Sequence, residues 1–161
     1  MKRSLPFLVL VLAGISFTSM AKETIKEYTV HPIGWVRKAP ESTSIVLNEK
    51  HQPGLLGLDG FSHVYVFYWL DRNDNPEKRS VLQVHPRGNK QNPLTGVFAT
   101  RSPARPNLIA LSLCKIIEIK KNVIEIDNID ALPDTPVLDL KPFIPHSEAG
   151  SATVPKWVLN R

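Results

Sequence analysis

The hydrophobic residues of this chain gather in short runs that turn-forming residues separate, and this spacing predicts many strands and no long helix. The clearest runs are Ser44–Leu47, His63–Leu70, Leu108–Lys120, Val123–Ile126 and Thr135–Leu140. We count about eight short strands with turn signals between them. The pattern predicts an all-β (mainly β) fold, either a sandwich or a barrel, with short connecting helical turns.

Three of the predicted strands carry more specific information. His63–Leu70 reads HVYVFYWL and is apolar at odd and even positions, so we expect a central strand that is buried on both faces. Tyr28–Val36 is also rich in β-forming residues, but Pro32 in its middle confines it to an edge or a bulge. Val123–Ile126 alternates, which predicts one wet face, and Asn122 before it suits a hairpin turn because asparagine tolerates positive φ.

The segments between these strands contain polar and turn-forming residues. We expect a strand at Ser80–His85. Polar turns are expected at Arg37–Thr43 and Asp127–Pro133, and a polar loop at Asp71–Lys78. Within Asn48–Leu58 we expect a helical turn that proline and glycine break.

Gly96–Ser112, which reads GVFATRSPARPNLIALS, stands out as a polar loop between two apolar strands. We expect its first strand to include Val97 and Phe98. Two prolines then stiffen a loop that carries Arg101, Arg105 and Asn107. Arginine offers a planar fork that suits a carboxylate or a phosphate, so the loop is a candidate binding site. The alternative is a surface loop whose arginines pair with carboxylates of the same chain.

Met1–Ala21 has the pattern of a secretory signal peptide: two basic residues, a short apolar run, and small residues before the expected cut. Cleavage would leave residues 22–27 as a loose terminus and predicts a periplasmic or secreted protein. An uncleaved membrane anchor is one alternative. A mis-assigned start codon is another, and it would make the protein cytoplasmic.

The composition limits the remaining possibilities. The 161 residues suit one domain, and loss of Lys2 and Arg3 would lower the basic count from 20 to 18 against 15 acidic residues, leaving a mildly basic chain. Cys114 lies in an apolar run and is expected to be buried, and the five histidines are scattered, so no metal site is predicted. The chain has no Gly-x-Ser-x-Gly elbow, so a serine nucleophile is not favoured. It also has no dinucleotide-binding fingerprint, which argues against a doubly wound methyltransferase.

Three strings in this order resemble one family: GLDGFSHVYVFYW, GVFATRSPARPN and TPVLDLKPF. The chain is similar to the TsaA-like (TrmO-like) family from about Tyr28 to about Pro145, which leaves 146–161 as a C-terminal tail. The resemblance implies a single β-barrel that binds S-adenosyl-L-methionine. It also implies methylation of N6 of threonylcarbamoyladenosine beside the tRNA anticodon, and a homodimer with the site near the subunit interface.

The resemblance also implies roles for particular residues, with no dedicated catalytic acid or base. The expected cofactor-binding residues are His63, Val64, Arg101, Asp134, Thr135 and Pro136. The expected substrate-binding residues are Arg105, Asn107 and Lys141.

The chain departs from the family pattern at three places. Leu94 stands where many members have arginine, Pro133-Asp134 stands where they have Asp-Gly, and an extra cofactor-contacting loop near the first strands is absent. These departures, with the predicted export, motivate an alternative function: an exported binding module for an anionic small molecule, without methyltransferase activity. A domain that binds a protein partner and no ligand is a third hypothesis.

Overall fold

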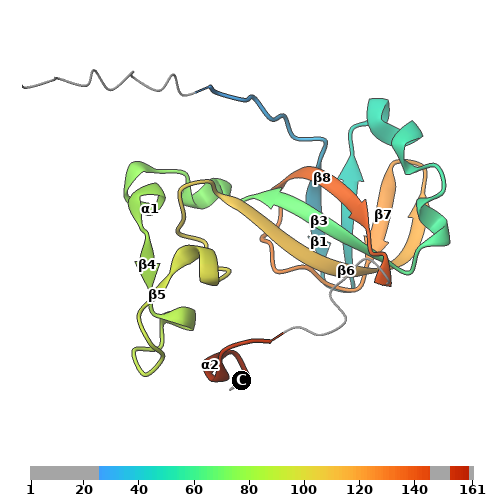
Figure 1. Cartoon of the computed structure of the whole chain (residues 1–161). Coiled ribbons are helices and arrows are strands. Elements are labelled where there is room, and N and C mark those ends of the chain that lie inside the picture. Colours follow the sequence, from blue (N-terminus) through green and yellow to red (C-terminus); the bar gives the residue numbers. More distant parts are fainter. Residues whose placement is uncertain (1–25, 146–152, 160–161) are drawn as a thin grey trace, which may run out of the picture.

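The computed structural model describes residues 26–145 and 153–159 (Figure 1). The predicted signal peptide and much of the C-terminal tail lie outside these residues. Within the described part, a closed barrel holds six strands in the order β1-β2-β7-β6-β3-β8. The strands are β1 (Gly34–Ala39), β2 (Ser42–Leu47), β3 (His63–Trp69), β6 (Ile109–Lys120), β7 (Val123–Ile126) and β8 (Pro136–Pro142). The prediction of an all-β barrel is therefore confirmed.

The barrel core is filled by branched side chains that point inward from alternate positions of each strand. Its fully buried members include Val36, Ile45, Val66, Ile124 and Val137. A barrel removes the exposed strand edges that an open sheet would leave. The predicted burial of Cys114 is confirmed, because its side chain is 0% exposed.

Strand β3 lies between β6 and β8, as a central strand should, but it is not buried on both faces. Its inward residues Val64, Val66 and Tyr68 are buried, whereas Phe67 and Trp69 are only half-buried on the outer face. On the outer face, neighbouring side chains shield the aromatic rings, and no second sheet is packed over them in the part of the chain that the structure describes. Trp69, for example, lies 5.3 Å below the guanidinium of Arg79.

The first strand begins later than the sequence pattern predicts. Residues 28–33 form no strand, because Pro32 cannot donate to a ladder, and pairing starts at Gly34. A Cβ at Gly34 would lie 2.4 Å from the carbonyl oxygen of Val46, so this close approach of β1 to β2 requires glycine. The strand then runs through Arg37 to Ala39, where a polar turn is expected, and the actual turn is Pro40-Glu41.

The β6–β7 hairpin also differs in detail. Lys121, not Asn122, adopts positive φ (53°) in the turn. The side chain of Asn122 instead donates a hydrogen bond to the carbonyl of Leu47 at 2.6 Å, which ties the hairpin to β2. The left-handed turn position is therefore one residue earlier than the sequence suggests, and Asn122 makes a long-range contact instead.

An arm of residues 71–107 projects from one end of the barrel, between β3 and β6 (Figure 1). Its elements are η3 (Asp71–Asn73), α1 (Pro76–Ser80), β4 (Gln83–Val84), η4 (Pro86–Gly88), β5 (Thr95–Gly96) and η5 (Val97–Ala99). The expected strand at Ser80–His85 is reduced to two residues. The expected strand at Val97–Phe98 is wrong, because these residues form a 3₁₀ turn in which Val97 is buried and Phe98 is exposed.

The remaining helical elements are short, as expected. They are η1 (Glu49–Leu55) and η2 (Leu58–Gly60) beside the barrel, and α2 (Lys156–Leu159) in the tail. In the described ranges, none of the helices has the length and apolar character needed to cross a membrane.

Candidate functional site

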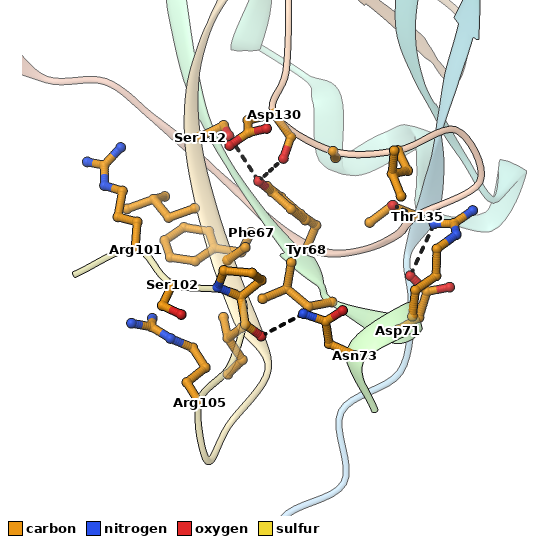
Figure 2. A pocket seen from close by; sticks show the side chains of 18 residues that line it. Phe67, Tyr68, Asp71, Asn73, Arg101, Ser102, Arg105, Ser112, Asp130 and Thr135 are labelled. Atoms are coloured by element: carbon orange, nitrogen blue, oxygen red, sulfur yellow. Dashed lines mark hydrogen bonds and ion pairs between the residues drawn. The ribbon is translucent and has the colours of Figure 1, made fainter. Parts of the chain in front are cut away.

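A cleft of about 540 Å³ opens where the arm joins the barrel (Figure 2). Its walls come from three stretches far apart in sequence: the end of β3 with η3, the segment from Arg101 to Ser112, and the loop before β8. The antiparallel pairing of β3 with both β6 and β8 brings these stretches together. The volume lies within the range of ordinary small-molecule pockets, so this cleft is the candidate ligand site.

Tyr68 lies at the floor of the cleft and is only 3% exposed. Its hydroxyl group donates a hydrogen bond to the carbonyl oxygen of Asp130 at 2.5 Å and lies 3.3 Å from the hydroxyl of Ser112 (Figure 2). Burial raises the pKa of Tyr68 above its ordinary value. The phenol is therefore a neutral donor that fixes the loop of Asp130 against β3.

The η3 turn joins the two side walls of the cleft. Arg72 donates to the carbonyl of Pro133 at 2.7 Å and to the hydroxyl of Thr135 at 3.3 Å. The next residue, Asn73, donates from its side-chain amide to the carbonyl of Pro103 at 3.0 Å. These two adjacent side chains therefore hold the loop before β8 and the arginine-bearing loop at a fixed separation.

Sequence reasoning missed Arg72 and Asn73, because the stretch Asp71–Lys78 reads only as a polar loop. Two of their partners, Pro133 and Pro103, accept through backbone carbonyls, which any residue type supplies. The one usable signal was their position directly after a buried strand, where polar side chains often line a site.

Arg101 and Arg105, the two arginines of the string GVFATRSPARPN, make different contacts. Arg105 donates from one terminal nitrogen to the carbonyls of Val97 and Thr100, both at 2.8 Å, and so braces its own loop. Its Nε atom is buried without a hydrogen-bond partner among the described residues. Arg101 is exposed and lines the cleft, so its guanidinium is the cation best placed to meet a ligand (Figure 2).

Three of the expected cofactor-binding residues, Asp134, Thr135 and Pro136, lie before and at the start of β8. Only one of them lines the cleft. Thr135 is 4% exposed and lines the cleft beside Arg72. Asp134 has a positive φ of 64°, and its carboxylate turns outward to an ion pair with Arg37 of β1. Pro136 begins β8 opposite Trp35 and does not line the cleft.

The other expected site residues also lie outside the cleft. His63 and Val64 are at the opposite end of β3, roughly 20 Å from its last residue at the usual rise of a strand. The side chain of Val64 is fully buried in the core. Lys141 pairs with Asp139 at 2.9 Å, and Asn107 is exposed at the base of the arm. The structure thus brings together Arg101, Arg105 and Thr135 from the expected set, and the roles of all nine residues stay predictions.

Two reactive groups and the candidate metal ligands complete the description. Adjacent side chains within a strand point to opposite faces, but Ser62 precedes β3, and its hydroxyl lies 2.8 Å from Nδ1 of His63. Among residues 26–145 and 153–159, no group of three or more His, Cys, Asp or Glu side chains is placed to hold a metal ion. Burial raises the pKa of Cys114 to about 12, so the thiol stays protonated.

Comparison with known proteins places this barrel among characterised relatives. Residues 23–149 match the family model described as the tRNA-methyltransferase O N-terminal domain. A probable S-adenosyl-L-methionine-binding protein of Methanocaldococcus jannaschii is 46% identical over 116 residues, which is 72% of this chain and 92% of that protein. The human tRNA (adenine(37)-N6)-methyltransferase is 41% identical over 97 residues, or 60% of this chain and 21% of that protein.

Solved structures agree with this result. The structure of TrmO from Pseudomonas aeruginosa matches with a TM-score of 0.64 and 26% identity, covering 83% of this chain. The chain spans 62% of the length of that solved protein, which leaves more than a third of it without a counterpart.

Proposed function

Because this chain belongs to the tRNA-methyltransferase O family, we propose that it binds S-adenosyl-L-methionine in the cleft and methylates N6 of an adenosine in tRNA. Two kinds of relative support this proposal: archaeal proteins named for binding the cofactor, and mammalian proteins named for methylating tRNA adenine 37. The finer substrate, threonylcarbamoyladenosine beside the anticodon, is part of the proposal.

The single observation that carries the proposal is the match between the cleft lining and the parts of the cofactor. Phe67, Ile109 and Leu132 supply apolar surface for a purine ring. Arg101 supplies a cation for the methionine carboxylate, and the Nε of Arg105 is a buried donor that still needs an acceptor. The donor set and the size of the cleft therefore fit S-adenosyl-L-methionine.

The residues of this chain contribute positioning more than acid–base chemistry. When bound, S-adenosyl-L-methionine supplies an electrophilic methyl group on a positively charged sulfur. Tyr68, Arg72 and Asn73 hold the walls in place through the hydrogen bonds described above. A rigid, partly dry cleft that orients two reactants supplies much of the acceleration that such a transfer needs, and no dedicated base is required.

The departures from the family pattern leave the cleft open. Asp134 occupies the glycine-like position, but it keeps the left-handed backbone and turns its carboxylate away toward Arg37. Leu94 lies in the arm and is 58% exposed, outside the cleft lining. Neither change blocks the cleft, which favours the methyltransferase over the binding-module alternative. The extra family loop has no counterpart near the first strands, where Pro40-Glu41 makes a two-residue turn.

We propose a homodimer as the working unit. The outer face of β6 exposes two large apolar side chains outside the cleft, Leu113 (45%) and Ile117 (54%). Such a stripe on a sheet face is a common feature of protein–protein contacts. A second copy of the chain would bury it.

The site of action follows from the substrates. Both tRNA and S-adenosyl-L-methionine are cytoplasmic, so the proposed reaction requires a pool of this protein in the cytoplasm. Met1–Ala21 remains a predicted signal peptide outside the described residues, and an exported pool would match the binding-module hypothesis instead.

The proposal is tested by calorimetric titration of the full-length protein with S-adenosyl-L-methionine. We expect saturable binding at micromolar concentration, weakened about 10- to 150-fold in Arg101→Ala, since a hydrogen bond to a charged group contributes about 1.5–3 kcal/mol. Lys120→Ala is the matched control, because it also removes one exposed cation but lies at the far end of β6. Absence of heat up to millimolar cofactor would overturn the proposal. Mass spectrometry of tRNA incubated with protein and cofactor then tests the transfer itself.

A further inference from the structure

Phe98 is the most exposed aromatic side chain of the described residues, at 83%. Its neighbour Val97 is 1% exposed and anchors the turn, so the chain buries one side chain and presents the next to solvent. A phenylalanine in this position contributes nothing to the core, and its ring is available for contact with a partner.

The backbone around Phe98 is firmly held. The guanidinium of Arg105 donates to the carbonyls on both sides of it, those of Val97 and Thr100, at 2.8 Å. The amide of Val97 donates to the carbonyl of Leu82 at 3.0 Å, which ties the turn to the other strand of the arm. The aromatic ring therefore projects from a preorganised support, and binding a partner would cost little conformational entropy.

The arm around this ring is positively charged. Residues 78–107 contain six lysines and arginines and no aspartate or glutamate. Arg79 and Arg105 donate hydrogen bonds inside the arm, and Lys78, Lys90 and Arg101 are exposed. A basic surface that also presents an aromatic ring has the two features by which proteins bind single-stranded nucleic acid.

The position of the ring links it to the cleft. Phe98 is three residues from Arg101, which lines the cleft, so their backbones are separated by at most about 11 Å. A strand of RNA with one base in the cleft would pass this ring with a neighbouring base.

We propose that Phe98 stacks on a base of a single-stranded RNA loop while Lys90 and Arg101 contact its phosphates. This inference rests on the proposed function, since the RNA is the substrate of that site. A second copy of the chain is a poorer occupant of this surface. A symmetric contact through Phe98 would place residues 78–107 of the two copies, which contain basic residues and no acidic ones, against each other and bring like charges together.

The test measures binding of the full-length protein to a fluorescein-labelled stem-loop RNA with the sequence of a tRNA anticodon arm, by fluorescence anisotropy. We expect Phe98→Leu to weaken binding about 5- to 150-fold, the range for loss of one base–aromatic stack. Phe98→Trp should retain affinity. Lys90→Gln should lower the slope of log affinity against log salt by about 0.7, the value for one phosphate contact to a single strand. Leu56→Ala is the matched control, because Leu56 is 95% exposed beside η1 and far from the arm in sequence.

Two companion measurements separate the outcomes. Calorimetry with S-adenosyl-L-methionine should give the same affinity for Phe98→Leu and the parent chain, and sedimentation velocity should show the same oligomeric state. Unchanged RNA affinity in Phe98→Leu would overturn this inference. Normal cofactor binding in the same variant would leave the proposed function unaffected. Dissociation of a dimer in Phe98→Leu would overturn it in favour of a self-association surface. Failure of the parent chain to bind cofactor, with Phe98-dependent RNA binding intact, would instead remove the proposed function and leave the RNA contact.

Discussion

Replacement of Tyr68 by phenylalanine isolates the contribution of one hydroxyl group to the cleft. The ring stays in place, so the packing against the core is unchanged, while the hydrogen bond to the carbonyl of Asp130 is lost. A neutral hydrogen bond contributes about 0.5–1.5 kcal/mol net, and a fully buried carbonyl left unpaired costs about 1–3 kcal/mol. Because Asp130 is on the rim of the cleft, water can reach its carbonyl, and we expect a loss of about 1 kcal/mol.

The measurement is urea unfolding of the parent chain, Tyr68→Phe and Tyr68→Ala. The alanine variant also removes the ring and should lose about 3–5 kcal/mol, as truncation of a buried aromatic does. A loss above about 3 kcal/mol in Tyr68→Phe would refute the reasoning, because it would show that Asp130 is sealed from water. A loss near zero would show that the hydroxyl does not hold the loop.

The same residue gives a prediction about pH. The pKa of Tyr68 is raised by burial in the folded state, so the unfolded chain ionises first as pH increases. Stability should therefore be unaffected by this group below about pH 10 and decline above it. Ultraviolet titration of the parent chain should show a late-ionising tyrosine component, and Tyr68→Phe should lack that component. Ionisation of all tyrosines at the ordinary pKa would contradict the burial argument.

Three further predictions test other parts of the structure. The thiol of Cys114 has its pKa raised to about 12 by burial, so stability should fall from about pH 9 toward pH 12, and Cys114→Ala should flatten that fall in urea unfolding; identical pH profiles would contradict it. Asp134→Ala loses the exposed ion pair with Arg37 and keeps a Cβ at positive φ, so it should destabilise the fold by less than about 1 kcal/mol, whereas Asp134→Gly loses the same ion pair but relieves the positive φ and should be the more stable of the two in thermal unfolding; equal effects would argue against backbone strain. If Met1–Ala21 is a signal peptide, the mature protein should begin at Lys22 in amino-terminal sequencing of the periplasmic or secreted fraction, and an intact Met1 confined to the cytoplasm would refute export.

Local sequence pattern was sufficient for most of the strands and for the family. Alternating or continuous apolar runs specify strands because side chains of a strand point to opposite faces with a period of two, and this property needs no knowledge of the neighbours. The runs at Ser44–Leu47 and Val123–Ile126 therefore became β2 and β7 with little change. The string with Arg101 and Arg105 likewise marked the side of the barrel on which the cleft lies.

The tertiary structure alone decided which strands are neighbours and which polar residues face the cleft. Pairing of β1 with β8 closes the barrel and turns Asp134 toward Arg37, away from the cleft that the sequence pattern suggested. Arg72 and Asn73 became supports of the site through carbonyls of Pro133 and Pro103, 61 and 30 residues away. Backbone carbonyls are the same at every residue, so no sequence signal identifies such partners before the chain is folded.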